Sequence, residues 1–295
     1  MTLDERLQSW AVAAAAPGAD VMEVRGLRDG GSPWLLRLSS DGRERGVVLR
    51  VGRDPAPLRT EVAALRLAEQ AGVSAPGLVA ADLDGDPPVI LIERLAGGSA
   101  IPVHPSVARL RALGAAAAAL HAVPLTPAPA LPRRERPIAV EDFAALRRAA
   151  QPDPLLAEAE KAANDRPVPG ENVFVHGDLW QGNVLWTGDN LVALIDWDCA
   201  GAGPAGVDLG SLRCDAALCY GLDAADDILR GWEEAAGRPA EDVAYWDVVA
   251  ALSTPPDMGW FVQAINGQGR PDLDQQTLVR RRNEFVRAAL DRLAG

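Results

Sequence analysis

The segment His-Gly-Asp-Leu-Trp-Gln-Gly-Asn at residues 176–183 decides how this chain of 295 residues is interpreted. It follows a short apolar stretch, residues 173–175, that predicts a strand. It leads into a predicted hairpin of strands 183–186 and 191–195, whose loop 187–190 (Thr-Gly-Asp-Asn) has typical turn chemistry. Asp196 ends this hairpin, thirteen residues after the asparagine. A loop and an adjacent hairpin can bring short polar side chains together at one point.

Two carboxylates and an amide in this order predict phosphoryl transfer. In that reaction one carboxylate receives or orients an attacking hydroxyl, while an amide oxygen and a second carboxylate hold Mg²⁺ against a triphosphate. The alternative is two solvated loop acids and a turn asparagine. It requires the loop residues to fall into this pattern by chance, which average residue usage makes rare.

The motif His-Gly-Asp-x-x-x-x-Asn, followed by a hairpin and an aspartate, resembles the catalytic loop and metal-binding segment of aminoglycoside phosphotransferases and their choline kinase-type relatives. These families are similar to protein kinases. The resemblance implies that Asp178 is the catalytic base or hydroxyl-orienting group and that Asn183 and Asp196 are Mg²⁺ ligands. It also implies that His176 supports the loop through a backbone contact. Asp208 stands where related kinases brace the loop backbone, although an N-cap of the following helix is an alternative.

Residues 20–93 predict a sheet of about five strands with one helix inserted after the third strand. The expected strands and helix, in chain order, are 21–25, 34–38, 46–51, helix 58–71, 78–83 and 88–93. The resemblance places the nucleotide site here. Family members carry lysine or arginine at this position to hold the α- and β-phosphates, and here the residue would be Arg50. The only lysine of the chain, Lys161, lies in the C-terminal region and is not available for this role. An exposed strand residue is the alternative for Arg50.

The partner of Arg50 is expected to be Glu61, with Glu69 as a competing choice nearer the end of the helix. Gly30, Gly31 and Ser32 form a turn that matches a phosphate-covering loop only loosely, because any hairpin can use such residues. The resemblance further implies that the backbone of Glu93 and Leu95 hydrogen-bonds the purine edge of ATP or GTP. The expected cofactors are therefore Mg²⁺ and a nucleoside triphosphate donor.

The remainder of the chain is predicted to be mainly helical. The expected helices are 107–123, 141–150, 154–164, 206–220, 223–236, 241–265 with a break at Pro255-Pro256, and 274–293, besides an N-terminal helix over 3–16. The expected fold class is α+β and bilobal, resembling protein kinases. A small antiparallel lobe with one inserted helix, 1–93, would bind nucleotide. A larger and mainly helical lobe, 94–295, would carry catalysis and substrate binding.

The charge of the chain bears on its partners. The net charge is −12, which disfavours nucleic acid as a partner. Residues 171–295 hold 20 Asp and Glu against 9 Arg, whereas residues 1–170 hold 21 against 20 Lys and Arg. The acidity of the second part is either a solvated face or a cleft that attracts cationic ligands. We expect a hydroxylated small molecule as acceptor, with an aminoglycoside or similar cationic antibiotic, and hence antibiotic resistance, as the first choice.

Other acceptors and other classes of protein stay open. Relatives phosphorylate macrolides, homoserine, choline or sugars, and a catalytically silent nucleotide-binding regulatory protein or a nucleotidyltransferase would share some of these features. Three residues are candidates for substrate contact. Asp198 is a substrate-side acid or a surface residue, and Trp180 and Trp260 are aromatic platforms or core residues.

Several classes of function are disfavoured. Three cysteines and three histidines lie at spacings that form neither a zinc site nor a disulfide framework. No stretch of about twenty apolar residues predicts a membrane span, and the N-terminus does not resemble a signal peptide. We therefore expect a cytoplasmic protein without membrane or nucleic-acid partners, either a monomer or a homodimer.

Overall fold

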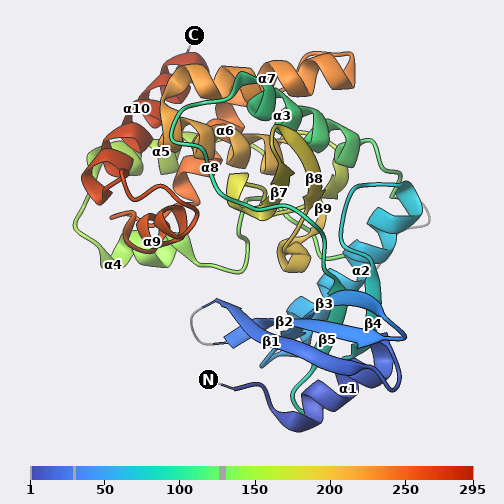
Figure 1. Ribbon diagram of the computed structural model, residues 1–295. Helices are drawn as coiled ribbons and strands as arrows, with labels where there is room; N and C mark the ends of the chain where they lie inside the picture. Colours follow the sequence, from blue (N-terminus) through green and yellow to red (C-terminus); the bar gives the residue numbers. More distant parts are fainter. Residues whose placement is uncertain (1, 29–30, 126–130, 295) are drawn as a thin grey trace. The chain divides into compact units, whose positions relative to one another are not determined.

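The structure is a computed structural model that describes residues 2–28, 31–125 and 131–294. The chain divides into two compact units (Figure 1). Unit 1 comprises Met1–Ala96 together with Ala193–Asp198, and unit 2 comprises Gly97–Val192 together with Cys199–Gly295. The sequence predicted a single division at residue 93. In the structure, residues 193–198 also belong to unit 1, which the prediction did not include.

Unit 1 contains a five-stranded sheet in the order β1-β2-β3-β5-β4, in which every neighbouring pair is antiparallel. Its elements are α1 (Glu5–Ala15), β1 (Asp20–Arg28), β2 (Gly31–Ser40), β3 (Arg43–Val51), α2 (Pro55–Ala71), β4 (Leu78–Asp82) and β5 (Val89–Glu93). The predicted sheet with one helix inserted after the third strand is confirmed. Leu36, Leu38, Val47 and Leu49 alternate along β2 and β3 and form its buried core with residues of α1.

Helix α2 carries Glu61 and begins three residues earlier than predicted. The Asp54 side chain accepts a hydrogen bond from the backbone N–H of Ala56, and Pro55 occupies the first turn, where its missing N–H costs nothing. The helix ends at Ala71, as predicted, and Gly72 caps it in the left-handed conformation. Glu61 lies on the buried face of this helix.

Unit 2 is mainly helical, as predicted. Its helices are α3 (Val107–His121), α4 (Phe143–Ala149), α5 (Pro154–Asn164), α6 (Gly206–Tyr220), α7 (Leu222–Ala236), α8 (Val243–Leu252), α9 (Gly259–Gly267) and α10 (Gln275–Ala294). Its strands are β6 (Asn172–Val175), β7 (Val184–Thr187) and β9 (Gly201–Pro204), and β8 (Asn190–Leu194) leads from unit 2 into unit 1. Strands β7 and β8 form the predicted hairpin, whereas β9, which pairs with β6, was not predicted.

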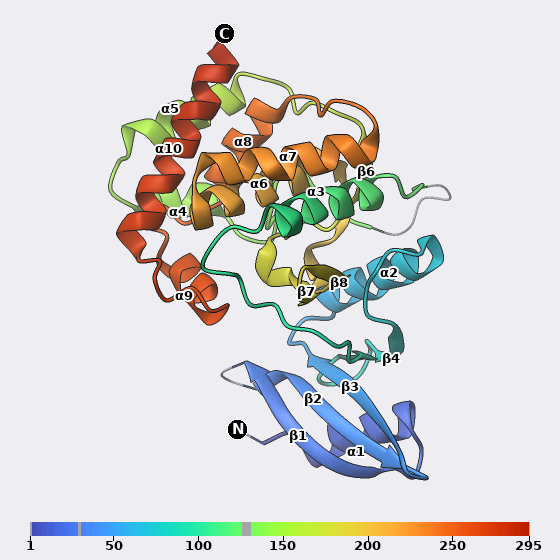
Figure 2. The ribbon, with the colours of Figure 1, turned by 45° about the horizontal axis from the view of Figure 1, so that its top comes forward.

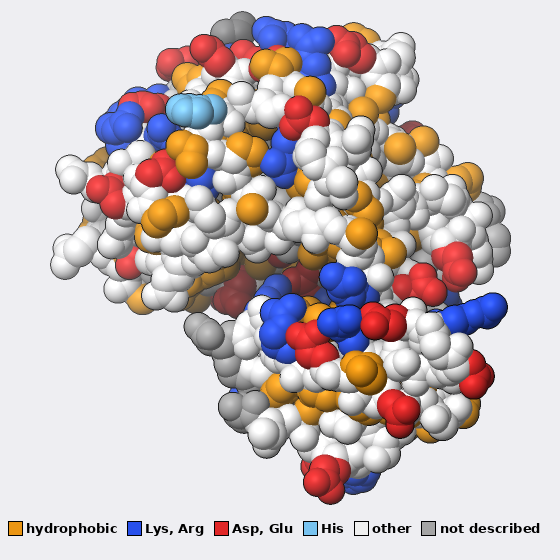
Figure 3. Space-filling view, viewed as in Figure 1, with side chains coloured by type: hydrophobic (Ala, Val, Ile, Leu, Met, Phe, Trp, Pro, Cys, Tyr) orange, Lys and Arg blue, Asp and Glu red, His pale blue; other side chains and the backbone are white. Residues whose placement is uncertain are grey.

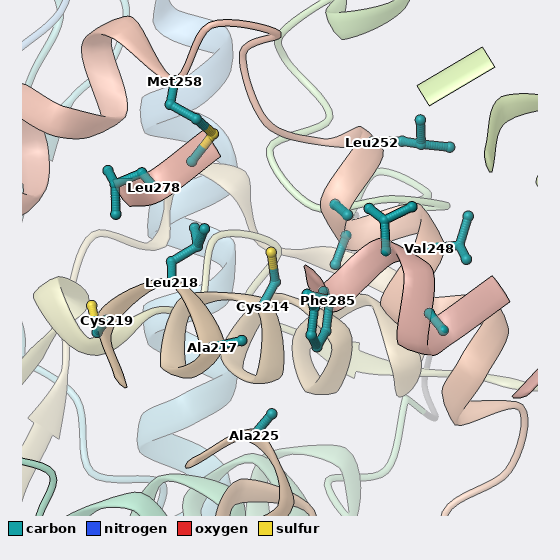
Figure 4. Packing of buried hydrophobic residues seen from close by; sticks show 14 of the residues in the cluster. Cys214, Ala217, Leu218, Cys219, Ala225, Val248, Leu252, Met258, Leu278 and Phe285 are labelled. Atoms are coloured by element: carbon teal, nitrogen blue, oxygen red, sulfur yellow. The ribbon is translucent and has the colours of Figure 1, made fainter. Parts of the chain in front are cut away.

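Helix α6 lies at the centre of unit 2, packed against α3, α7, α8 and α10 (Figure 2). Cys214, Ala217 and Leu218 of α6 point into an apolar cluster with Phe285 of α10 and Met258 (Figure 4). Nearly all of α6 is buried, so its polar residues must find partners inside the protein.

Charged side chains of both signs are interspersed on the visible face of unit 1 (Figure 3). Among the described residues, no helix combines the length and the apolar character needed to cross a membrane.

Candidate active site

The loop between β6 and β7 brings Asp178 and Asn183 together within unit 2. The side-chain Nδ2 of Asn183 donates to the backbone O of Asp178 at 2.9 Å and to its carboxylate Oδ2 at 3.1 Å. A short 3₁₀ helix, Gln181–Asn183, closes this loop, and the Asn183 N–H donates to the carbonyl of Trp180 at 3.0 Å. The amide nitrogen therefore faces the acid, and the amide oxygen takes no part in these two contacts.

Gly177 fits the loop for two physical reasons. Its φ of +79° lies in the left-handed region, where side chains are strained. A Cβ at this position would also lie 2.1 Å from the carbonyl oxygen of Cys199. The glycine of the His-Gly-Asp motif thus permits a close backbone approach directly before Asp178.

Asp208, in the first turn of α6, holds the start of the loop. Its Oδ2 accepts the backbone N–H of His176 and its Oδ1 accepts the backbone N–H of Gly177, both at 2.8 Å. The N-cap position of α6 is Ala205, and no side chain caps it. The Asp208 carboxylate is therefore used by the loop backbone and not by the end of its own helix.

A chain of buried hydrogen bonds stands behind Asp208. The indole Nε1 of Trp232 donates to Nδ1 of His121 at 3.0 Å, and Nε2 of His121 lies 3.2 Å from Oδ2 of Asp208. An indole N–H only donates, so Nδ1 accepts and the histidine carries its proton on Nε2. His121 is thus a buried structural residue that donates to Asp208.

In unit 1, Arg50 of β3 lies among three carboxylates. Its Nη1 contacts Oε1 of Glu61 at 2.8 Å and Oδ1 of Asp196 at 2.6 Å, and its Nη2 contacts Oδ2 of Asp198 at 3.0 Å. Arg28 adds a second guanidinium, 2.8 Å from Oδ2 of Asp196. Glu61 is thus the partner of Arg50, and Asp198 lies beside the same arginine.

The charges of this cluster shift its pKa values. Burial alone would raise the pKa of Asp196, but Arg50 and then Arg28 outweigh it and lower the pKa to about 2. Burial raises the pKa of Glu61 to about 8 against the opposing effect of Arg50, and Asp196 and Asp198 add to the rise. Glu61 Oε2 is buried without a hydrogen-bond partner among the described residues. Burial lowers the pKa of Arg50, but the carboxylates raise it overall.

The backbone at Asp196 is held in an uncommon conformation. Its φ is +67°, in the left-handed region that costs a residue with a side chain about 1–3 kcal/mol. Two anchors in unit 1 fix the segment around it. The N–H of Leu194 donates to the carbonyl of Ser74 at 2.9 Å, and the fully buried Trp197 donates from Nε1 to the carbonyl of Leu194 at 2.9 Å.

A pocket of about 220 Å³ adjoins this cluster within unit 1. Three arginines, Arg28, Arg50 and Arg53, and two acids, Asp54 and Asp198, line it together with uncharged residues of β2, β3 and α2. A small pocket with three guanidinium groups suits an anionic ligand such as a phosphate chain.

The predicted nucleotide-loop residues have mixed positions. Gly30 lies outside the described residues, and Gly31 begins β2 with a φ of +112°. The hydroxyl oxygen of Ser32 accepts the backbone N–H of Val51 at 3.0 Å. The backbone N–H of Glu93 donates to the carbonyl of Gly77 at 2.8 Å, so it already has a partner. Leu95 follows the sheet as a half-buried residue.

The two candidate aromatic residues differ in surroundings. Trp180 is half-buried, packs on the apolar cluster of unit 2, and covers the space beside Gly182. Trp260 of α9 is 42% exposed and stacks on Phe143, with ring centroids 6.3 Å apart. Trp260 is therefore the one of the two that offers a large aromatic surface to solvent.

The sequence profile of the phosphotransferase enzyme family matches residues 23–252. The chain belongs to this family. The match spans both units, including the loop of Asp178 and Asn183 and the cluster around Arg50. The predicted recognition is confirmed, and membership indicates a kinase-type enzyme.

Solved structures share the fold of this phosphotransferase at low sequence identity. One from Ralstonia eutropha, described as a putative aminoglycoside phosphotransferase, has 17% identity and a TM-score of 0.68, covering 97% of this chain and 99% of its own. A macrolide 2′-phosphotransferase from Brachybacterium faecium has 21% identity and a TM-score of 0.63, covering 94% and 98%. A spectinomycin phosphotransferase solved with ADP and spectinomycin has 15% identity and a TM-score of 0.62, covering 98% of each chain.

The predicted α+β, kinase-like fold class is confirmed by these structures. No curated protein matches the sequence. In this phosphotransferase, Asp178 and Asn183 belong to unit 2, whereas Arg50, Glu61, Asp196 and Asp198 belong to unit 1. Two residues of the candidate site were not predicted from sequence. Arg28 contacts Asp196, and the buried Asp215 of α6 contacts Gln181 inside the loop.

Proposed function

We propose that this phosphotransferase transfers the γ-phosphoryl group of ATP or GTP to a hydroxyl group of a small molecule. The observation that carries the proposal is the loop in which Asp178 contacts Asn183 while Asp208 holds the backbone before it. Such a loop keeps a carboxylate in a defined position, which a hydroxyl-orienting group requires.

In the proposed reaction, the acceptor oxygen forms a bond to the γ-phosphorus as the bond from that phosphorus to the β–γ bridging oxygen breaks. The nucleoside diphosphate leaves with that oxygen. Asp178 orients the acceptor hydroxyl and takes its proton as the new bond forms. Asp208 and His121 keep the loop in place while this happens.

The arginine-lined pocket of unit 1 supports nucleotide binding there. Arg50 would contact the α- and β-phosphates, and Arg28 and Arg53 would add positive charge. The N–H of Glu93 already donates to Gly77. The edge of a purine would therefore accept a hydrogen bond from the backbone N–H of Leu95 and donate one to the backbone carbonyl of Glu93.

The residues present fit a magnesium ion by their chemistry. Asp196 has a low pKa and pairs with two guanidinium groups. Its carboxylate is therefore ionised and lies in a position that binds cations. Asn183 adds an amide oxygen, and Mg²⁺ commonly takes one or two protein oxygens besides water and phosphate. When bound, the ion would neutralise charge on the transferring phosphates.

For the acceptor, we propose an aminoglycoside or a similar cationic compound. The net charge of −11 over residues 171–295 supports a cationic ligand. The exposed ring of Trp260 offers an apolar surface on which a sugar could stack.

The test is an acceptor panel with the whole protein, Mg²⁺ and ATP or GTP. The panel holds aminoglycosides, macrolides, choline, homoserine and sugars, and mass spectrometry reads each product. We expect one acceptor to gain a single phosphoryl group, with nucleoside diphosphate as the second product. A nucleoside monophosphate adduct would instead identify a nucleotidyltransferase. Tight nucleotide binding without any transfer would favour the regulatory alternative.

A further inference from the structure

Asp215 of α6 contacts the middle of the loop that carries Asp178. Its Oδ2 accepts the side-chain Nε2 of Gln181 at 2.8 Å and the backbone N–H of Gln181 at 3.2 Å. Both residues are buried, with 7% of Asp215 and 6% of Gln181 exposed. Gln181 opens the short 3₁₀ helix that ends at Asn183.

Asp215 lies seven residues after Asp208 on the same helix. Seven residues make almost two turns, so the two carboxylates lie on one side of α6 within about 20°. Asp208 holds the backbone at Gly177, and Asp215 holds it at Gln181. Asp178 is therefore flanked in the chain by two points attached to one helix, which also contributes Cys214, Ala217 and Leu218 to the apolar cluster (Figure 4).

The oxygen end of the Gln181 side chain lies beside Tyr220. The hydroxyl of Tyr220 donates to the carbonyl of Pro102 at 2.7 Å and lies 3.4 Å from Oε1 of Gln181. With its oxygen toward Tyr220, the amide turns Nε2 toward Asp215. Because the single hydroxyl proton of Tyr220 goes to Pro102, the 2.8 Å hydrogen bond from Nε2 to Asp215 sets the orientation of the amide.

We propose that Asp215 is a positioning residue that fixes the loop between Asp178 and Asn183 by way of Gln181. The proposal rests on the proposed function of that loop. Burying an ionised carboxylate costs stability unless it is well hydrogen-bonded. A side chain that only filled space at this place would not need a charge, so the contribution of Asp215 is to the geometry of the loop.

The pH dependence separates this role from a merely structural one. Burial raises the pKa of Asp215 to about 6, although Gln181, Cys219 and Arg270 oppose the rise. The titratable or charged groups that face it are Cys219, Arg270, Cys214 and Tyr220. Because the folded pKa exceeds the ordinary value of 3.8, protonation of Asp215 adds stability as the pH falls through 6. Protonation also removes the ionised acceptor of Gln181, so turnover falls over the same range.

The test compares wild type with Asp215→Asn and with Asp223→Asn, an exposed acid in the first turn of α7. Each protein is assayed for transfer to the best acceptor, for Mg²⁺-nucleotide affinity and for Tm, between pH 5 and pH 8. We expect Asp215→Asn to lower kcat by about 10- to 100-fold with nucleotide Kd changed less than about twofold. Its turnover should lack the acid limb near pH 6, and its loss of Tm should be greater at pH 5 than at pH 7. Asp223→Asn should match wild type.

A second variant guards against misfolding of the first. Gln181→Met keeps the length of the side chain and the backbone N–H but removes the Nε2 donor, so it should fold and still lower kcat. Wild-type kcat and an unchanged pH profile in both folded variants would overturn the proposal. If wild type itself transferred no phosphoryl group and Asp178→Asn changed nothing, the proposed function would fail instead.

Discussion

At the scale of single residues, Arg50 determines how the unit 1 cluster is held together. One guanidinium reaches Glu61, Asp196 and Asp198 through two of its nitrogens. Lysine carries a compact ammonium that cannot reproduce this planar fork. The pairing with Asp196 and Asp198 spans 146 and 148 residues of sequence, so it joins distant segments of the chain.

We therefore expect Arg50→Lys to weaken Mg²⁺-nucleotide binding by about tenfold, because bidentate contacts to phosphate are lost. Isothermal titration calorimetry measures this affinity. Arg25→Lys is the matched control, since Arg25 lies on the exposed part of β1 and pairs with Glu23. Equal affinity in all three proteins would return Arg50 to the alternative of an ordinary strand residue.

The candidate site could be predicted from sequence only where its residues form a local motif. Asp178 and Asn183 stand five residues apart, and that spacing carries their interpretation. Arg28 meets Asp196 across 168 residues, and Asp215 meets Gln181 across 34. No local pattern encodes such contacts, because they depend on how α6 and the strands of unit 1 pack. Asp208 was found only through the family resemblance.

At the scale of elements, the close packing of α3 against α7 supports the hydrogen bonds that run from Trp232 through His121 to Asp208. His121 lies at the end of α3, and its hydrogen-bond partner Trp232 lies in α7. The two helices approach so closely that a Cβ on Gly231 would lie 2.2 Å from the backbone oxygen of Arg111. The small residue therefore sets the distance between these helices.

Gly231→Ala should lower the free energy of unfolding by about 1–3 kcal/mol, because the new methyl group forces α3 and α7 apart. Thermal or denaturant unfolding measures the change. Gly267→Ala in α9 is the control, since the added Cβ would lie more than 4 Å from every atom outside its chain neighbours and its own helix backbone. That control should be as stable as wild type, and equal stability of both variants would mean that the helices shift at no cost.

Most elements were predictable because their patterns are local. Helical periodicity, caps and turn residues located the helices, and alternation located the five strands of unit 1. Strand β9, Gly201–Pro204, escaped because its sequence Gly-Ala-Gly-Pro has low strand propensity. It is a strand because β6 pairs with it, and its glycines leave room for Arg134. Tertiary packing here overrides the local preference.

At the scale of the whole molecule, the candidate groups are shared between the two units. Unit 2 supplies Asp178 and Asn183, and unit 1 supplies Arg50 and Asp196. Asp196 belongs to unit 1 because residues 193–198, which follow the start of β8, return to that unit. In the proposed reaction, unit 2 would orient the hydroxyl and unit 1 would bind the phosphates, and a variant can separate the two roles.

Asp178→Asn makes that separation in one preparation, by comparing turnover with Mg²⁺-nucleotide affinity in the variant and in wild type. Asparagine keeps the shape of the side chain and an oxygen but cannot take a proton. We predict that kcat for phosphoryl transfer falls by about 10²–10⁴-fold while nucleotide Kd changes by less than about twofold. A fully active variant, or one whose nucleotide binding collapses together with its turnover, would contradict the role given to Asp178.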